Sequence, residues 1–406
     1  MLSLGRRSWP VLISLALLSV FVITDLLASN RSTQSEQEAF QRFWPDNLFA
    51  VDFVDEKHGF IGGYSGTFLS TEDGGESWQA GYVGSNELIR RISFINPQVG
   101  WAVGHRGSIF HTQDGGHSWN VQKKIENTYL RDISFLNENV GWAVGHDAVI
   151  LFTRDGGRLW KRQYLTDYSG RDLPRLHGIE ALSPSSAMLV GEFGTIAYTS
   201  DEGDTWSLVE NESDKTLLDL TVVHQEPALE FLAAGLDGTI QRIALASEAE
   251  RKGIRDVRLK KAQRQWRKDR SHARRRGDSF DMPEPIDVEL HEREFTAVMV
   301  PSNTTENLFA IKATTGGKAY AVGRAVFLEI NGSEPRFLEP AEGLPFAYMW
   351  LGGVDVTPQG SIWSVGIRGN VVRGAVGDSA FAPALSLAKP ENIEKISSRW
   401  DRRTRE

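Results

Sequence analysis

The chain has 406 residues, 40% of them hydrophobic and 24% charged, which is the composition of a folded globular protein rather than a disordered one. It contains no cysteine, and this excludes disulfides, thiolate metal sites and a cysteine nucleophile. The formal net charge of −8 hides an asymmetry, because residues 251–276 carry thirteen Lys and Arg against two Asp.

The N-terminal segment has the pattern of an export signal. Arg6 and Arg7 precede an apolar run from Trp9 to Thr24 that continues past Asp25 to Ala28. The run is slightly short for a membrane span of about 20 residues, and Ala28 alone supplies a small residue for cleavage. Residues 1–30 are therefore predicted to be a cleaved signal peptide or an uncleaved anchor, followed by a polar tether at 31–43. The rest is expected on the periplasmic side of the bacterial inner membrane, anchored by residues 9–28 or released.

A motif of the form T-x-D-(G/E)-G-x-x-W occurs four times, at residues 71–78, 112–119, 153–160 and 199–206. Before each copy lie segments of alternating polarity, which indicate half-buried β-strands. A glycine that closes a short apolar segment recurs in every unit and continues beyond the last motif. Its positions are Gly63, Gly104, Gly145, Gly191, Gly235, Gly323 and Gly366, with spacings of 41, 41, 46, 44, 88 and 43 residues.

These spacings predict an all-β protein. Seven units of about 40–45 residues, each with four strand-sized pieces, are typical of a seven-bladed β-propeller with four-stranded antiparallel blades. We assign the propeller to residues 44–385, with a basic helical insertion at 246–285 in the fifth blade and a charged tail at 386–406. The interval of 88 residues is interpreted as one repeat enlarged by this insertion, or as one repeat plus a degenerate one. The N-terminal apolar run is expected to be a separate helix.

The recurring aspartates have a structural interpretation. A carboxylate can accept backbone hydrogen bonds within a tight turn, glycine permits positive φ, and tryptophan buries a large ring. A calcium loop needs several oxygen ligands within a few residues, and paired catalytic carboxylates must converge, whereas these lie on four blades. No catalytic residue, metal site or cofactor is predicted. The residues assigned to the structural motif are Asp73, Trp78, Asp114, Trp119, Asp155, Trp160, Asp201 and Trp206.

The repeat, nearly intact from Gly100 to Trp119, resembles the bacterial neuraminidase repeat, also called BNR repeat or Asp box. The whole arrangement, over residues 44–375, is similar to the photosystem II stability/assembly factor family. The resemblance implies a non-catalytic, exported or membrane-anchored propeller that assists assembly of a membrane-protein complex through an arginine-rich face. The basic insertion is not part of the family's core pattern. Nothing in the chain shows that its host photosynthesises, so we expect a relative from a non-photosynthetic bacterium.

The opposite face of the ring is the expected working face. In a four-stranded antiparallel blade, the Asp motif lies on one face, and the second-strand turns and inter-blade links lie on the other. Arginine gathered there suits an acidic peptide segment or a chain terminus, although solvated surface arginines are the competing interpretation. The candidate client-binding residues are Arg90, Arg91, Arg106, Arg131, Arg171, Arg175, His177, Arg324 and Arg368.

Several functional alternatives remain at this stage. The basic stretch 251–276 could attract anionic lipid, dock on an acidic partner or form a solvated hairpin, and the export signal argues against nucleic acid. His105 and His146 occupy equivalent places on adjacent blades, which we interpret as a product of the repeat rather than a metal site. A sialidase-like glycoside hydrolase would need a tyrosine with a glutamate partner, and no such pair is evident. An accessory subunit of a membrane transport system is the third possibility. The sequence identifies neither the client nor the oligomeric state.

Overall fold

The computed structural model describes residues 47–386, apart from 166–167, 226–227, 289, 291–292, 333 and 343, together with residues 396–398. The predicted signal or anchor, the tether and most of the tail lie outside the described residues. Within the described part, no helix is both long enough and apolar enough to cross a membrane.

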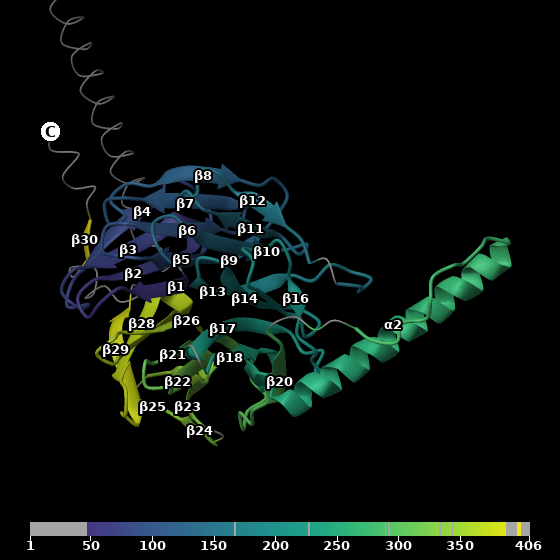
Figure 1. Cartoon of the computed structure of the whole chain (residues 1–406). Helices are drawn as coiled ribbons and strands as arrows, with labels where there is room; N and C mark the ends of the chain where they lie inside the picture. The colour runs from purple at the N-terminus through teal and green to yellow at the C-terminus, as the bar shows by residue number, and fades with distance from the viewer. Residues whose placement is uncertain are drawn as a thin grey trace, which may run out of the picture. The chain divides into compact units, whose positions relative to one another are not determined.

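The described residues form seven antiparallel sheets in chain order, as the repeat predicts (Figure 1). The first four blades carry the Asp boxes, and each runs from its innermost to its outermost strand. Their strands are β1 (Leu48–Phe53), β2 (Gly59–Gly63), β3 (Thr67–Thr71) and β4 (Trp78–Tyr82) in blade 1; β5 (Ile89–Phe94), β6 (Gly100–Gly104), β7 (Ser108–Thr112) and β8 (Asn120–Lys124) in blade 2; β9 (Leu130–Phe135), β10 (Gly141–Gly145), β11 (Ile150–Thr153) and β12 (Lys161–Gln163) in blade 3; and β13 (Leu176–Ser183), β14 (Ser186–Gly191), β15 (Ile196–Thr199) and β16 (Ser207–Leu208) in blade 4.

The last three blades have no Asp box but keep the same strand order. Short 3₁₀ turns lie at Leu236–Gly238 in blade 5, at Phe346–Tyr348 before blade 7 and at Ile367–Gly369 in blade 7, and blade 1 has one at Tyr64–Gly66. The strands are β17 (Leu217–His224), β18 (Glu230–Gly235), β19 (Ile240–Leu245) and β20 (Phe295–Met299) in blade 5; β21 (Leu308–Ala313), β22 (Ala319–Gly323), β23 (Phe327–Asn331) and β24 (Glu334–Phe337) in blade 6; and β26 (Leu351–Val356), β27 (Ser361–Gly366), β28 (Asn370–Ala375) and β29 (Ala380–Ser386) in blade 7.

Two short strands extend the outer edges of the terminal blades. β25 (Glu339–Pro340) pairs in parallel with β29, and β30 (Ile396–Ser398) pairs in parallel with β4. All four antiparallel strands of blade 1 come from the N-terminal side and all those of blade 7 from the C-terminal side. The ring therefore closes by packing and hydrogen bonds between blades 7 and 1 and by the parallel β30, rather than by exchange of an antiparallel strand.

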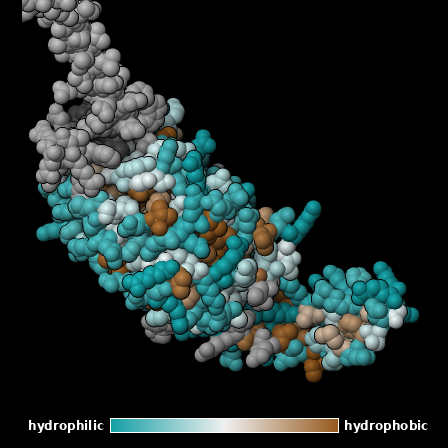
Figure 2. Space-filling view, turned by 90° about the horizontal axis from the view of Figure 1, so that it is seen from above, coloured by the Kyte–Doolittle hydropathy of each residue, from teal (hydrophilic) through white to brown (hydrophobic). Residues whose placement is uncertain are grey.

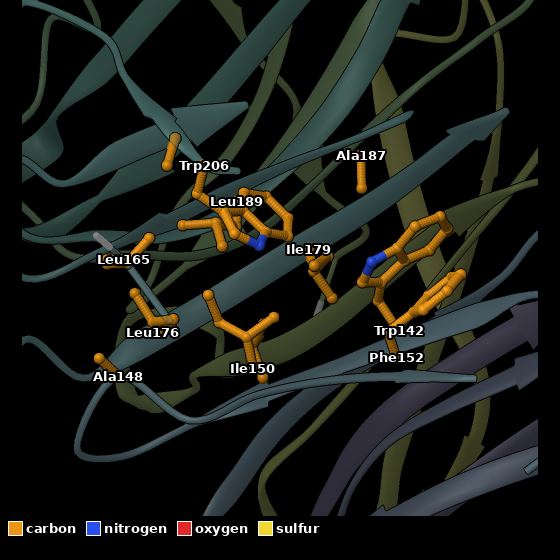
Figure 3. Packing of buried hydrophobic residues seen from close by; sticks show 12 residues of the cluster. Trp142, Ala148, Ile150, Phe152, Leu165, Leu176, Ile179, Ala187, Leu189 and Trp206 are labelled. Atoms are coloured by element: carbon orange, nitrogen blue, oxygen red, sulfur yellow. The ribbon is translucent and has the colours of Figure 1, made fainter. Parts of the chain in front are cut away.

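The hydrophobic core lies between adjacent blades. The second strands, such as β6 and β10, are buried along their whole length because each sheet is covered on both sides by its neighbours. Figure 3 shows one such layer, a single cluster that includes Trp142 and Phe152 of blade 3 and Leu189 and Trp206 of blade 4, with Ile179 between the two pairs. Fully burying side chains of this size contributes about 1.5–3 kcal/mol each.

The innermost strands are also joined by side-chain hydrogen bonds, which hold neighbouring blades at a fixed offset. The fifth residue of one strand accepts a backbone N–H from the next blade. The donor and acceptor pairs are Phe94 N to Asp52 (2.6 Å), Phe135 N to Ser93 (3.1 Å), Ala181 N to Ser134 (3.1 Å), Ala313 N to Thr221 (3.0 Å) and Phe53 N to Asp355 (2.6 Å). The last of these closes the ring from blade 7 to blade 1.

The basic insertion contains the helix α2 (Glu248–Arg276), between β19 and β20 of blade 5. Ser247 and Glu250 form a capping box at its start, and Gly277 ends it in a left-handed conformation with φ 76°. Its 29 residues span about 43 Å, and Figure 1 shows α2 extending away from the blades. At its base, Arg258 makes two hydrogen bonds to the buried carboxylate of Glu294, at 2.7 and 2.8 Å.

Candidate functional site

The Asp-box turns are fixed by hydrogen bonds within each motif. In blade 1, Asp73 Oδ1 accepts from Ser77 N at 2.9 Å and from Thr71 Oγ1 at 2.8 Å. Asp73 Oδ2 accepts from Ser77 Oγ at 2.6 Å, and Thr71 Oγ1 in turn accepts from Gly75 N at 2.9 Å. The equivalent bonds recur around Asp114, Asp155 and Asp201, except that Leu159 has no hydroxyl to donate. The threonine has a structural role that the sequence analysis did not assign.

The Asp-box tryptophans lie between their own blade and the preceding one. Trp119 of blade 2 lies 5.2 Å from Phe68 of blade 1 and 6.0 Å from Phe94 of its own blade. Trp78 lies 6.1 Å from Trp363 of blade 7. Glycine is required beside these rings, since a Cβ on Gly75 would come within 2.3 Å of Trp363, and its φ is +84°. The motif therefore joins blades as well as closing turns.

The opposite face carries the starts of the innermost strands. The second residue of each of these strands lies on this face at the centre of the ring, and we call these seven positions the hub. Three neighbouring blades contribute basic side chains and the others apolar side chains or glycine. The hub residues are Phe49, Arg90, Arg131, His177, Leu218, Phe309 and Gly352.

Arg91, the next residue after a hub position, is not a free surface arginine. Its Nε lies 2.9 Å from Asp132 of blade 3, and a terminal nitrogen lies 2.7 Å from Asp219 of blade 5. Both carboxylates are buried, and Asp132 and Asp219 also accept backbone N–H groups from Ile179 and Ile311. Arg91 is therefore a structural ion-pair partner, which corrects its assignment to the client-binding set.

Further titratable groups line the centre of the ring below the hub. Lys312 Nζ lies 3.3 Å from Asp355, whose charge is the main cause that raises the pKa of this lysine. Burial, together with the charge of Asp355, raises the pKa of Asp52. Burial also raises the pKa of Glu180 to about 7, which Lys312 partly opposes. Carboxylates thus outnumber cations in this layer, and protonation relieves part of their repulsion.

Arg90, Arg131, Arg175, His146 and His177 form a group of interacting side chains on this face, which we call the basic group. Burial followed by the charges of Arg131 and Arg90 lowers the pKa of His177 to about 3. Burial and the charges of Arg131 and Arg175 lower the pKa of His146 to about 4. Both imidazoles are therefore neutral near pH 7, and the positive charge comes from the arginines.

The arginines of the basic group have few partners. Arg131 Nε donates to His146 Nε2 at 2.9 Å, and Arg90 lies 5.8 Å from the centre of the Phe49 ring. Neither makes an ion pair with any residue that the structure describes. Arg175 does so at 3.4 Å with Glu192, with half of its side chain exposed. Burial lowers the pKa of Arg90 to about 10 and also lowers that of Arg131. Partly desolvated guanidinium groups without carboxylate partners favour an incoming anion.

The remaining candidate arginines are exposed and more scattered. Arg106 follows His105, whose pKa is lowered by burial and by the charge of Arg106. Arg324 and Arg368 lie in the second-strand turns of blades 6 and 7, and Arg368 has φ 54°. Arg171 is exposed before β13. The structure thus brings together three of the nine candidates, Arg90, Arg131 and His177, with Arg175 at their edge.

The apolar hub residues were missed by the sequence analysis. Phe49, Leu218 and Phe309 are half-buried, and none of them was among the predicted candidate residues. Comparing the second residue of every innermost strand would have identified them, because that position alternates out of the core. Trp350, in the link before β26, lies 5.2 Å from Phe49 and 6.5 Å from Phe309.

Two observations bear on catalysis and metals. A Tyr–Glu pair does exist, which corrects the sequence analysis: Tyr320 Oη donates to Glu329 at 2.9 Å. It lies between β22 and β23 inside blade 6, and burial and Glu329 raise the pKa of Tyr320, so its phenol stays protonated. In the described part of the chain, no three His, Asp or Glu side chains are grouped to hold a metal ion.

Comparisons with known proteins agree with the predicted resemblance. A family model described as photosynthesis system II assembly factor YCF48 matches residues 82–251. The structure of YCF48 bound to D1 peptide is similar over 82% of this chain and 92% of that chain, with 15% identity and a TM-score of 0.53. YCF48 from Cyanidioschyzon merolae is similar over 82% and 96%, with 14% identity and a TM-score of 0.55.

An ancestral GH74 enzyme shares the fold as well. It is similar over 85% of this chain and 47% of that chain, with 10% identity and a TM-score of 0.56. No curated protein in the comparison matches the chain. At these identities the structural likenesses show the propeller fold alone, and the family model adds the YCF48-like repeat across blades 2–4 and most of blade 5.

Proposed function

We propose that this chain, a YCF48-like propeller, is a non-catalytic binding scaffold that assists assembly or stability of a membrane-protein complex. The basic group carries the proposal, because Arg90 and Arg131 are partly desolvated and have no carboxylate partner among the described residues. The ligand is a peptide segment or chain terminus of a client that presents a carboxylate to this group. A relative of the same fold is solved with a D1 peptide, which supports a client peptide as the ligand class.

A peptide-binding assay tests this function. Fluorescence anisotropy with a labelled D1 peptide and with a Glu-rich peptide should show saturable binding to the intact protein. Replacing Arg90, Arg131 and Arg175 together by Gln should weaken binding at least tenfold, about 1.4 kcal/mol, with an unchanged thermal midpoint. Arg158→Gln, an exposed position in the Asp-box turn of blade 3 on the opposite face, is the matched control. Equal affinity of the triple variant and the parent would overturn the proposal.

The same protein serves to test the enzyme alternative. Incubation with aryl sialosides and β-glucans is expected to give no hydrolysis above that of buffer. Turnover that disappears on a single Tyr or Asp substitution would replace the scaffold function by a glycoside hydrolase. Client purification after crosslinking in native membranes distinguishes an assembly client from a transport complex.

We also propose that α2 contacts anionic lipid headgroups. Lys260, Lys261, Arg264, Lys268 and Arg275 lie along one exposed side of the helix and make no ion pair with a described residue. The other side is covered by the return segment, through Gln263 to Pro285 O at 2.9 Å and Trp266 to Met282 O at 2.8 Å. Figure 2 shows a mostly hydrophilic surface with separate hydrophobic areas, so attraction by charge is favoured over insertion. Each basic residue near an anionic membrane adds about 1 kcal/mol.

Vesicle sedimentation tests the lipid contact. Protein should sediment with phosphatidylglycerol vesicles at low salt, but not with phosphatidylcholine vesicles, and binding should fall as salt increases. Replacing Lys260, Lys261, Arg264 and Lys268 by Gln should abolish it, whereas Arg90→Gln should not. Binding of duplex DNA through the same lysines, without vesicle binding, would contradict the proposal.

The location is proposed as the periplasmic side of the inner membrane. The apolar run at 9–28 supports this, and it lies outside the described residues. Accessibility of the propeller to protease in spheroplasts, and the mass of the mature chain, would test export and cleavage together. A propeller protected in spheroplasts and degraded only after lysis would contradict export.

A further inference from the structure

The hub is divided into two arcs of different chemistry. Blades 2, 3 and 4 contribute Arg90, Arg131 and His177, whereas blades 5 and 6 contribute Leu218 and Phe309 and blade 1 contributes Phe49. In blade 7 the hub position is Gly352, and the indole of Trp350 takes its place. A Cβ on Gly352 would come within 2.7 Å of that indole. These residues, which occupy successive places from blade 5 round to blade 1, form the apolar arc.

The aromatic rings of the apolar arc contact one another but are not covered. Phe49, Phe309 and Trp350 are each half-buried. Beside them, Tyr64 has its ring centre 6.2 Å from that of Phe49 and is 49% exposed, and Tyr348 is 88% exposed. Aromatic side chains gathered at the centre of a face, rather than dispersed over it, are typical of the anchoring part of a protein interface.

The apolar arc meets the basic group at one point. The Arg90 guanidinium lies 5.8 Å from the centre of the Phe49 ring, so a carboxylate on Arg90 would lie beside the aromatic surface. On the other side of Phe49, the ring of Trp350 follows at 5.2 Å. A single extended segment can therefore contact both arcs, with its charged and its apolar side chains bound next to each other.

We propose that the apolar arc, formed by Phe49, Leu218, Phe309 and Trp350, binds an aromatic or branched aliphatic side chain of the same client segment whose carboxylate binds the basic group. This inference rests on the proposed function and specifies its ligand. The recognised segment combines an acidic group with a nearby large apolar side chain. Charge complementarity of the adjoining basic group selects an acidic peptide rather than an uncharged apolar surface.

The arrangement also gives specificity that arginine alone does not provide. Guanidinium groups attract any accessible carboxylate, and exposed charges are screened by salt. Burial of an apolar side chain against the aromatic rings adds a contribution that salt does not screen. An acidic segment without the apolar residue should therefore bind weakly at physiological ionic strength.

Selection from a random peptide display library tests the inference on the full-length protein. With the parent protein, enriched peptides should contain an acidic residue together with Phe, Trp, Leu or Ile. With Trp350→Ala, the acidic enrichment should persist and the apolar enrichment should disappear. With the Gln triple variant of Arg90, Arg131 and Arg175, the acidic enrichment should disappear. Tyr164→Ala, which removes an exposed aromatic ring on the outer side of blade 3, is the matched control.

Affinities of one selected peptide complete the test. Replacing its apolar residue by Ser should weaken binding to the parent protein about tenfold or more, but leave binding to Trp350→Ala almost unchanged. Acidic enrichment without any apolar preference would overturn the apolar arc and leave the proposed function intact. No acidic enrichment would overturn the proposed function itself. A concentration-dependent dimer in sedimentation, lost in Trp350→Ala, would instead identify a second copy as the occupant and overturn the inference.

Discussion

Blades 2–4 and blades 5–7 form the same four-stranded sheets with different residues at the third turn and at the hub. Blades 2–4 close their third turn with an Asp box and present basic residues at the hub. Blades 5–7 have no Asp box, and their hub positions are apolar or glycine. Blade 5 carries α2 in that turn, blade 6 turns at Gly332 with φ 71°, and in blade 7 Asp378 accepts from Ala375 N at 3.0 Å. The strand framework is shared, so neither turn nor hub chemistry decides the fold.

The residues that stabilise the turns are separate from those proposed to bind a ligand. The Asp-box turns and the hub lie on opposite faces, so each can change without altering the other. Blades 2–4 are joined to blades 5–7 at Arg91, whose guanidinium on blade 2 pairs with Asp132 on blade 3 and with Asp219 on blade 5. Changing this ion pair therefore tests most directly whether blades 2–4 and blades 5–7 stabilise each other.

Removing Arg91 should have the largest effect on stability. Arg91→Met is expected to lower the free energy of unfolding by about 3–5 kcal/mol, because two buried carboxylates lose their shared cation. Guanidinium denaturation followed by tryptophan fluorescence measures the change. Adding Asp132→Asn and Asp219→Asn should recover part of it. Arg106→Met, at an exposed position, should stay within about 0.5 kcal/mol of the parent; a similarly small effect of Arg91→Met would show that the ion pair does not join blades 2–4 to blades 5–7.

Loss of an Asp box should destabilise the protein less than loss of Arg91, but more than loss of the simpler third turn of blade 7. Asp114→Ala removes the acceptor of three hydrogen bonds from Ser118 and Thr112 and should cost about 1–3 kcal/mol. Asp378→Ala removes one backbone bond and should cost about 0.5–1 kcal/mol. Urea denaturation at pH 7 compares the two variants. Equal costs would mean that the Asp box is no stronger than the simpler turn.

The cost of Asp114→Ala should also depend on pH. Burial raises the pKa of Asp114, but hydrogen bonds from Ser118 and Thr112 outweigh this and hold it below the ordinary 3.8. Its stabilising contribution is therefore present above pH 3.8 and is lost as the pH falls through the lower folded value. The difference between parent and variant should shrink in acid.

Glu180 should show the opposite pH dependence. Its folded pKa is raised by burial to about 7 from 4.5, so its stability contribution is complete below pH 4.5 and is lost as the pH rises to 7. Glu180→Gln should raise the free energy of unfolding at pH 8 by about 1–2 kcal/mol, less than the full shift because the side chain is only half-buried. At pH 4 the two proteins should be equal. Glu306→Gln, an exposed control, should change neither value; destabilisation by Glu180→Gln at pH 8 would contradict the raised pKa.

Much of the architecture could be predicted because it is local and repeated. A spacing of 41 residues with a closing glycine defines a blade, and the order of turns assigns the Asp box and the arginines to opposite faces. The tryptophans were expected to bury their rings, and Trp78 and Trp206 do so whereas Trp119 and Trp160 are half-buried. Their packing against the preceding blade was not predicted, since it depends on how sheets meet. The Tyr320–Glu329 pair was missed because cross-strand register within blade 6 brings together residues nine positions apart.

Arg90 and Arg91 show what the sequence determined and what tertiary structure decided. The sequence by itself predicted both in the link between blades 1 and 2, on the face of the ring opposite the Asp boxes. Only closure of the ring brought Asp132, 41 residues away, and Asp219, 128 residues away, to Arg91 while leaving Arg90 beside Phe49. The register shift between Ile89 and Arg91 in the pairing of β5 with β6 lets these neighbours point differently. Whether an arginine is neutralised or free depends on contacts between distant blades, and a repeat read from the sequence does not contain them.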